Sequence, residues 1–554
     1  MRWPIDWPVR RKLARPRPAP PSSRVYAAFA VAAILGLTIF LIWWLTSGVP
    51  VPPGQAEKPG LEVAANPDPA PAGAALEASL PRGGSLTGSA DSIEVAALRL
   101  TAAPLVRVNL STDLLESSLA ESWSATPDNL IYTVKLRPGL ATADGKVLTA
   151  ADIAASLGPV AAMGQPVAVR ATDAAGLEIR FSAPFAPGLR LFDRHPLPGL
   201  GPFIEEVGGS AQTGARTFRR NPHYWRKGSD GLPLPYLDAI GLTSAPAANG
   251  QNDFADTAIP AEDFEGLKKL EQAGRVRLFD LGPGLDADAL WFSLSPPLAD
   301  ERPWLTSEAL RLAISTAVDR REYCKQVFFG ACDPMAGPVS PANVAWFNPD
   351  FPLGQANPQL ARSMLAELGL RDRSGDGMLD DAARRPLRFS LLIRRDVPSS
   401  ARAASFLANT LKAIGVEVEV TPLAAASLAA RRRTGNYDAI YDRIEVHDTD
   451  PAMNLDFWTS SGAAHVWNPA RRSRPADWER QIDELMSRNA TIFDRAERLQ
   501  AFVDAQKLYL QHMPAIFFGA PHVRIVTSVR TLNASPSPLR PHLLWNAESL
   551  AALK

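Results

Sequence analysis

Residues 118–152 read SLAESWSATPDNLIYTVKLRPGLATADGKVLTAAD, and this stretch indicates the fold class. Within it, Leu130–Leu136 is β-branched and aromatic with a period of two, which predicts a β-strand that ends at the turn signal of residues 137–139 (RPG). Thr149 and Asp152 form a capping-box pattern at the start of an amphipathic run, which predicts a helix. A strand followed closely by a helix indicates a mixed α/β architecture.

Strand-like and helix-like segments continue to alternate along the chain, as they do in mixed α/β proteins. Apolar residues at helical spacing predict further helices at Ser307–Val318, Asn357–Leu368, Ala401–Ile414 and Arg495–Met513. Short apolar runs predict further strands at Leu290–Leu294, Leu387–Ile393, Val416–Val420 and Ala515–Phe518.

Composition excludes several classes of protein. The chain has 554 residues, of which 46% are hydrophobic and 21% charged, so it is globular, and its length predicts two or three folding units. Its 58 basic and 58 acidic residues give no net charge, so we expect no nucleic-acid partner. The sequence contains no phosphate-binding glycine loop, no nucleophile elbow and no His-Glu-x-x-His motif, and we therefore expect no enzymatic activity.

The N-terminal region differs from the rest of the chain. Residues 1–24 carry seven basic side chains and one acidic side chain, and Val25–Leu45 (VYAAFAVAAILGLTIFLIWWL) carries no charge. As a helix this segment is about 31 Å long, which matches the hydrocarbon core of a membrane. We expect residues 1–24 to be a basic cytoplasmic head and residues 25–45 a transmembrane anchor, with the body outside the cytoplasm. A cleaved signal peptide is the alternative. Residues 46–81, rich in Pro, Ala and Gly, predict an extended linker.

Several short motifs, in this order, resemble the family 5 extracellular solute-binding proteins, which are the peptide- and nickel-type binding components of ABC importers. The resemblance spans about residues 82–544. The motifs include residues 118–123 (SLAESW), 132–139 (YTVKLRPG), 220–225 (RNPHYW), 310–322 (LRLAISTAVDRRE), 435–438 (GNYD) and 514–517 (PAIF).

This resemblance implies a two-lobed α/β fold of the periplasmic-binding-protein-like class II type, preceded here by the transmembrane helix. The first lobe would comprise residues 82–292 and 519–554, and the second residues 293–518. The implied function is the substrate-binding component of an ABC importer, which binds peptides in the interlobe cleft, closes by hinge motion and docks on permease subunits. Two alternatives stay open: a non-peptide ligand such as a metal chelate or an oligosaccharide, and a membrane-anchored sensor or scaffold that has lost transport.

The resemblance also suggests ligand-binding residues. Many peptide-binding members of the family have the motif Asp-Tyr-x-Asp/Glu-Pro. Its first aspartate, four residues before the proline, pairs with the α-amino group of the peptide. Counting back from Pro451 places His447 at that position, with Asp448 next and Asp450 directly before the proline. Because a histidine carries at most part of a charge near neutral pH, it would not attract an ammonium group. Either Asp448 takes this role through a shift of one residue, or the ligand is not a free-amine peptide.

Three tryptophans, Trp291, Trp458 and Trp467, lie nearest the predicted cleft strands. We expect Trp458 and Trp291 to contact the ligand, although either side chain could instead fill the core of a lobe.

Two further features concern cysteines and metal. Cys324 and Cys332 could form one disulfide outside the cytoplasm or stay as separate thiols. Residues 372–381 (DRSGDGMLDD) resemble a calcium-binding loop without the glutamate at its twelfth position, and a polar turn without metal is the alternative. The candidate calcium ligands are Asp372, Ser374, Asp376 and Asp380. We expect no other cofactor.

Overall fold

The computed structural model describes residues 80–206, 215–243, 252–294, 303–468 and 474–553. The chain divides into a unit at residues 1–60 and a unit at residues 61–554, and the described residues all belong to the second of these. The predicted cytoplasmic head, the predicted anchor and all but the last two residues of the predicted linker lie outside the described residues. Within the described ranges, none of the helices has the length and apolar character needed to cross a membrane.

A five-stranded antiparallel sheet contains the stretch that indicated the fold class. Tyr132, Val134 and Leu136 of its strand β6 point into the core while Thr133 and Lys135 face outward, so the predicted alternation is confirmed. The next helix, α4 (Ala150–Leu157), begins with the expected capping box between Thr149 and Asp152. The strand order is β5 (Ala120–Ala125), β6 (Ile131–Leu136), β9 (Gly176–Phe181), β8 (Gln165–Ala171) and β7 (Val160–Ala162).

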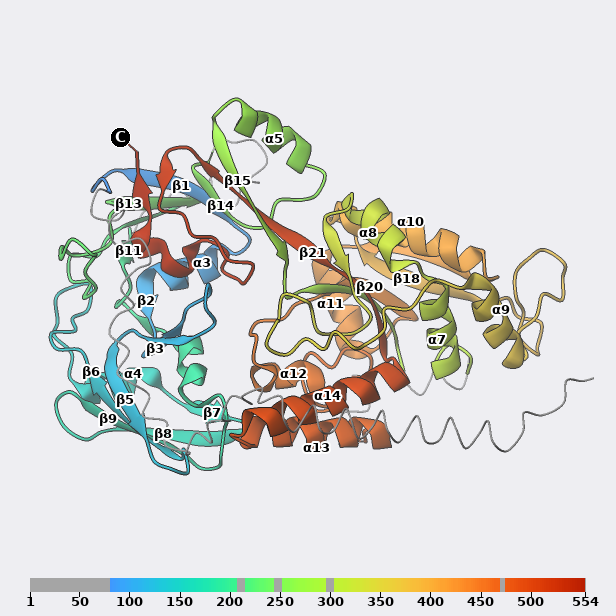
Figure 1. Cartoon of the computed structure of the whole chain (residues 1–554), viewed down its shortest axis with the longest axis horizontal. Coiled ribbons are helices and arrows are strands. Elements are labelled where there is room, and N and C mark those ends of the chain that lie inside the picture. Colours follow the sequence, from blue (N-terminus) through green and yellow to red (C-terminus); the bar gives the residue numbers. More distant parts are fainter. Residues whose placement is uncertain (1–79, 207–214, 244–251, 295–302, 469–473, 554) are drawn as a thin grey trace, which may run out of the picture. The chain divides into compact units, whose positions relative to one another are not determined.

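The main sheet contains twelve strands of the described residues (Figure 1). One end of it is built, in order, from β11 (Phe203–Glu205), β12 (Arg216–Arg220), β13 (Ala239–Thr243), β1 (Ser85–Ala90) and β14 (Phe254–Asp256), with β15 (Val276–Pro283) close by. The other end is built from β16 (Ala287–Phe292), β20 (Ala439–Ile444), β18 (Arg388–Arg394) and β19 (Glu417–Leu423), with β17 (Cys332–Pro334). We name the part around β1 and β11–β15, together with the five-stranded sheet and the C-terminal segment after β21, the first lobe. The part around β16–β20 is the second lobe.

Strand β21 (Ala515–Ser528) belongs to both ends of the main sheet. Its first residues pair with β16 and β17 of the second lobe, and its last residues pair with β14 and β15 of the first. Figure 1 shows this long strand running from one part of the molecule into the other. The sequence predicted a strand only at Ala515–Phe518, because Gly519 and Pro521 read as strand breakers. Both edges of β21 are paired in this region, and that pairing carries the strand past them.

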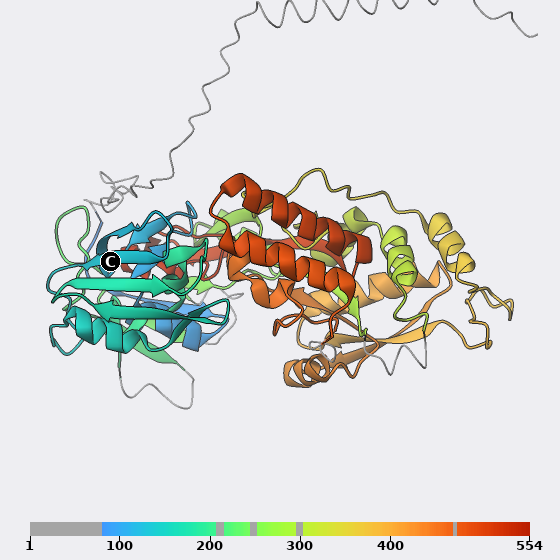
Figure 2. The same cartoon turned by 90° about the horizontal axis from the view of Figure 1, so that it is seen from below.

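The second lobe has helices on both faces of its sheet, and it therefore has two hydrophobic cores. Leu290 and Phe292 of β16 point into one core, and Ala289 and Trp291 point into the other. Every residue of β16 is buried for this reason. The first core is covered by α7 (Glu308–Ala317), α8 (Arg320–Phe328), α9 (Pro358–Glu367) and α10 (Pro398–Lys412), and the second by α11 (Ala425–Thr434), α12 (Leu455–Trp458), α13 (Asp477–Thr491) and α14 (Arg495–His512). Figure 2 shows α13 and α14 lying side by side.

The predicted helices of the second lobe are confirmed by α7, α9, α10 and α14, and two of its predicted strands are confirmed by β18 and β19. The remaining short elements belong mainly to the first lobe. They are α3 (Ile93–Thr101), α5 (Phe264–Gln272), β2 (Ala102–Ala103), β3 (Val106–Val108), β4 (Leu115–Ser117), β10 (Leu197–Pro198), β22 (Thr531–Leu532) and β23 (Ala551–Ala552).

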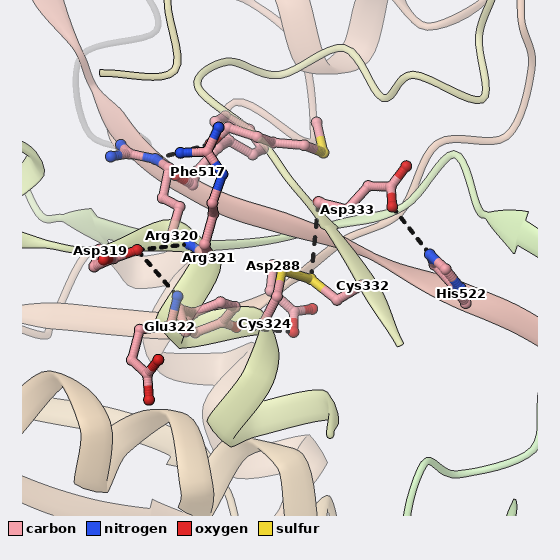
Figure 3. Close-up of a disulfide and its surroundings, with 12 residues drawn as sticks. Asp288, Asp319, Arg320, Arg321, Glu322, Cys324, Cys332, Asp333, Phe517 and His522 are labelled. Atoms are coloured by element: carbon pink, nitrogen blue, oxygen red, sulfur yellow. Dashed lines mark hydrogen bonds and ion pairs between the residues drawn. A yellow bond between two sulfur atoms is a disulfide. The ribbon is translucent and has the colours of Figure 1, made fainter. Parts of the chain in front are cut away.

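The two cysteines, whose pairing the sequence left open, are joined in a disulfide (Figure 3). Cys324 lies on α8 and Cys332 begins β17, and their Cα atoms are 5.2 Å apart, a normal spacing for a disulfide. The bridge packs on β21 at Gly519, where a Cβ atom would collide with both sulfur atoms. Nearby, Arg320 Nε donates a hydrogen bond to the carbonyl oxygen of Phe517, 2.9 Å away. The disulfide and Arg320 therefore fix β21 close to the point where it leaves the second lobe.

Candidate functional site

A cavity of about 680 Å³ lies beside strand β20. The second lobe supplies most of its wall, from β20 and the segment after it, from α11 and from the loop at residues 338–343. Two arginines come from the first lobe: Arg194, at the end of the 3-10 helix η1 (Gly188–Arg194), and Arg540, in the C-terminal segment. A cavity whose wall comes from both lobes is the kind of concave site in which proteins bind small ligands.

One side of the cavity is apolar and firmly packed. It includes Val339, Met453, Phe457, Trp458 and Phe502. The ring of Trp458 meets those of Phe502 and Phe457 edge to face, at centroid distances of 5.0 and 5.2 Å. Because these contacts leave only 6% of Trp458 exposed, its ring is held in place as a fixed part of the wall. The structure thus places one predicted tryptophan at the cavity.

The segment after β20 forms the edge of the cavity and carries His447. His447 is exposed and lines the cavity, together with Thr449. The segment is held at both ends. Val446 donates its backbone N–H to Asp286, 3.0 Å away, and Asn343 donates its side-chain amide to the carbonyl oxygen of Thr449 at 2.8 Å. The position of His447 therefore follows from contacts made by its neighbours.

Asp448 does not line the cavity, because its carboxylate is turned toward the first lobe. Arg190 Nε donates to its Oδ1 at 2.8 Å, and Arg194 lies 3.6 Å from its Oδ2. Burial raises the pKa of Asp448, and the charge of Arg190 acts in the opposite direction. Arg190 also bonds Asp113 at 2.6 Å and Thr449 at 2.9 Å. Asp448 is thus part of an ion-pair network between the lobes.

Asp450 is likewise engaged by the protein. Its carboxylate accepts the backbone N–H of Ala452 at 2.9 Å, and it receives Arg498 on both oxygens, at 2.7 and 2.9 Å. The aspartate therefore begins the 3-10 helix η3 (Pro451–Met453) and ties it to α14. Of the three predicted polar residues, the structure brings His447 to the cavity and uses Asp448 and Asp450 as structural anchors.

Trp291, the second predicted tryptophan, has no exposed surface. It lies on β16 in the core between the sheet and α11–α14, among Trp467, Tyr437 and Leu428. Because strands on both sides and helices above cover β16, a large ring on this face fills the core of the second lobe and does not reach the cavity.

Sequence reasoning missed a polar cluster of which three members, Asp288, Tyr441 and Arg443, line the cavity. Asp288 of β16 accepts a hydrogen bond from Tyr441 at 2.8 Å and from Arg443 Nε at 2.8 Å. Tyr323 completes the cluster through hydrogen bonds to Tyr441 and Asp288. Burial raises the pKa of both tyrosines well above the ordinary value, so both hydroxyls keep their protons. The signal that could have located Tyr441 and Arg443 is the alternation along β20, but their partners come from distant segments.

The candidate calcium loop is an ordered polar turn in the structure. The carboxylate of Asp372 accepts the backbone N–H groups of Gly375 and Gly377, at 2.6 and 2.9 Å. Asp376 accepts from Met378, and Asp380 accepts from Arg373. Ser374 lies in the same turn, exposed. Among the described residues, no three His, Cys, Asp or Glu side chains are placed to hold a metal ion. Calcium binding stays a prediction.

Comparison with known proteins gives two curated relatives of particular interest. The chain is 24% identical over 336 residues to a probable ABC transporter-binding protein of Deinococcus radiodurans, and this match covers 56% of each chain. It is 22% identical over 445 residues to the probable D,D-dipeptide-binding periplasmic protein of Escherichia coli, covering 74% of this chain and 79% of that one. The chain thus spans little more than half the length of the Deinococcus protein.

Solved structures share the fold. The oligopeptide-binding protein AppA of Bacillus subtilis, in complex with a nonapeptide, superposes with a TM-score of 0.70 at 20% identity, covering 86% of this chain and 100% of that one. NikA of Brucella suis, in complex with Fe(III)-EDTA, superposes with a TM-score of 0.69 at 19% identity, covering 85% and 100%. The expected mixed α/β fold of a two-domain solute-binding protein is confirmed.

The model of the family described as bacterial extracellular solute-binding proteins, family 5, matches residues 115–465, which is more than half of the chain. The matched region holds the five-stranded sheet, β20 and most of the cavity wall. The protein therefore belongs to the family 5 bacterial extracellular solute-binding proteins, as its sequence motifs predicted.

Proposed function

We propose that the chain is the substrate-binding component of an ABC importer and that it binds peptides in the cavity beside β20. The single observation that carries this proposal is a cavity of about 680 Å³ with apolar and polar walls contributed by both lobes. This volume suits a short peptide rather than a macromolecule. The names of the relatives, a D,D-dipeptide-binding protein and an oligopeptide-binding protein, support a peptide ligand.

Ligand binding would be coupled to hinge motion. The chain passes between the lobes at residues 284–286 and along β21, and these two segments would act as the hinge. Arg194 and Arg540 would approach or leave the second lobe as the lobes move. A closed form would bury the ligand and present both lobes to the permease.

A non-peptide ligand is the second candidate, and one observation favours it. Asp448, which could have replaced the missing amine-binding aspartate by a shift of one residue, is bonded to Arg190 and does not line the cavity. Members of the same fold also hold other ligands, such as Fe(III)-EDTA in NikA of Brucella suis and stachyose in MelB of Agrobacterium fabrum.

We propose further that Val25–Leu45 anchors the body at the outer face of the cytoplasmic membrane. The length of this uncharged segment and the basic residues before it support the proposal. If it is correct, the full-length chain stays in the membrane fraction after carbonate extraction at high pH. Release of a shortened chain into the soluble fraction would indicate cleavage instead.

Mass spectrometry of bound ligands tests the main proposal. The full chain is purified in mild detergent without added ligand, denatured, and its released small molecules are identified. We expect a mixture of short peptides at close to one per protein molecule. Recovery of a sugar or a metal chelate, with no peptide, would replace the peptide by the second candidate class.

A further inference from the structure

Four carboxylates line the cavity, and they differ in what they bind. Asp288 is saturated by Tyr441, Tyr323 and Arg443, as described above. Glu445 is exposed and lies 3.6 Å from Arg540. Asp456 is exposed to solvent, where water satisfies a carboxylate at little cost. The fourth is Asp442.

Asp442 is half-buried on β20, and within the described part of the chain its side chain forms no ion pair. The hydrogen bond that it accepts comes from the backbone N–H of the next residue, Arg443, at 2.9 Å. Burial raises its pKa, and the charges of Arg394 and Arg432 act in the opposite direction. Asp442 is therefore a partly desolvated carboxylate at the cavity wall.

The nearby arginines do not neutralise this carboxylate by direct contact. Arg394 uses its guanidinium for two hydrogen bonds to Asp396, at 2.8 and 2.6 Å. Arg432, in the last turn of α11, is exposed and also lines the cavity, and it forms no ion pair with Asp442. Arg443, on the opposite face of β20, is bound to Asp288. A ligand in the cavity could therefore still pair with the carboxylate of Asp442.

A half-buried carboxylate without an ion-pair partner destabilises the ligand-free protein, and a cationic group that enters the cavity offsets that cost. We propose that Asp442 selects the ligand by pairing with a positively charged nitrogen, supplied either by the terminal amine of a peptide or by a Lys or Arg side chain. This inference deepens the proposed peptide-binding function and rests on it.

Calorimetric titration of the full chain, freed of bound ligand, with three synthetic peptide pools tests the inference. The first pool is Ala-X-Ala with a free amine and neutral X. The second is the same pool with acetylated amines. The third is acetylated and has Lys or Arg at X. We expect the first pool, the third pool or both to bind at least about tenfold more tightly than the second. The pool that binds more tightly than the second pool identifies the source of the positive nitrogen.

The variant Asp442→Asn keeps the size and shape of the side chain but removes its charge. We expect it to bind all three pools with the weak affinity of the acetylated neutral pool. Asp350→Asn is the matched control, because Asp350 is an exposed aspartate that does not line the cavity. It should change these affinities less than about twofold.

The outcomes separate this inference from the proposed function. If the wild-type chain binds all three pools equally well, peptide binding stands and the role of Asp442 is refuted, even without the variant. The same holds if Asp442→Asn keeps the preference for a positive charge. If the wild-type chain binds none of the pools, the proposed function and the inference fail together.

Discussion

The junction between the lobes and the wall of the cavity use aspartates in opposite ways. At the junction, Asp448 is bonded to Arg190, and the same arginine bonds Asp113 and Thr449. On the cavity wall, six residues earlier in the sequence, Asp442 is half-buried and has no ion pair with a described residue. A paired buried charge holds the protein together, whereas an unpaired one costs stability and is free to meet a ligand. The predictions below test this contrast, beginning with the largest expected effect.

Removal of Arg190 should break the junction. In Arg190→Ala, Asp448 and Asp113 lose their shared cation while Asp448 stays buried, and we expect the free energy of unfolding to fall by about 3 kcal/mol. Urea unfolding of wild-type and variant chains measures this loss. Arg180→Ala is the control, because Arg180 is exposed and lies 3.4 Å from Glu178, and it should cost less than about 0.5 kcal/mol. Equal losses in the two variants would show that burial adds nothing to the Arg190 network.

Loss of the disulfide should destabilise the chain by a different route. The bridge joins cysteines that are separated by 8 positions in the sequence, and chain entropy predicts a stabilisation of about 2.5 kcal/mol for a loop of this size. The double variant Cys324→Ser, Cys332→Ser should therefore unfold at a lower urea concentration under oxidising conditions. Under reducing conditions the wild-type chain should approach the variant. A wild-type chain that is insensitive to reductant while the variant is destabilised would contradict the entropic explanation.

Gly519 tests how tightly the disulfide packs on β21. Gly519→Ala places a methyl group against both sulfur atoms, and we expect a loss of about 2 kcal/mol in the free energy of unfolding. Gly266→Ala, in the open surface of α5, is the control and should gain roughly 0.5–1 kcal/mol. The cost at Gly519 should shrink in the cysteine-free variant, since the serine oxygens are smaller than sulfur. If Gly519→Ala lowered the free energy of unfolding equally in the cysteine-free variant, the methyl group would be strained against another part of β21.

Asp442→Asn should have the smallest effect on stability, and it should raise the free energy of unfolding. Burial raises the pKa of Asp442 in the folded chain above its value in the unfolded chain, so the folded chain loses stability as the pH rises through that interval. The charges of Arg394 and Arg432 limit this rise in pKa, whereas the charge of Asp288 adds to it. We expect the ligand-free variant to be more stable than the wild type by roughly 0.5–1 kcal/mol at pH 8, and by less at pH 4.

Thermal unfolding of the wild type and of Asp442→Asn from pH 4 to pH 8 measures the difference in their stability. Asp456→Asn, at an exposed position, should show no such trend. A difference between Asp442→Asn and wild type that does not grow with pH would mean that Asp442 is uncharged, or paired, in the folded protein.

The short-range features of the fold were predictable because local chemistry sets them. The alternation of Tyr132, Val134 and Leu136 placed β6, and Thr149 with Asp152 placed the start of α4. The length of β21 was not predictable from its own residues. Gly519 and Pro521 read as breakers, and the strand continues because β15 and β17 lie beside it, which depends on segments far away in the sequence.

The candidate site was only partly predictable for the same reason. His447, which was found by counting back from Pro451, and Trp458 both line the cavity, and their contact with a ligand stays a prediction. The roles of Asp448 and Trp291 depended on partners that sequence does not reveal, namely Arg190 and the helices over β16. Asp442 had no motif around it and was missed.

The sequence by itself determined the family, the mixed α/β fold and most secondary-structure elements, because hydrophobic periodicity and local capping are encoded within short stretches of chain. Tertiary structure alone decided which acidic residue is neutralised and which is open to a ligand. The charge state and availability of a carboxylate depend on burial and on cations within a few ångströms, and for Asp448 and Asp442 those neighbours come from other parts of the fold.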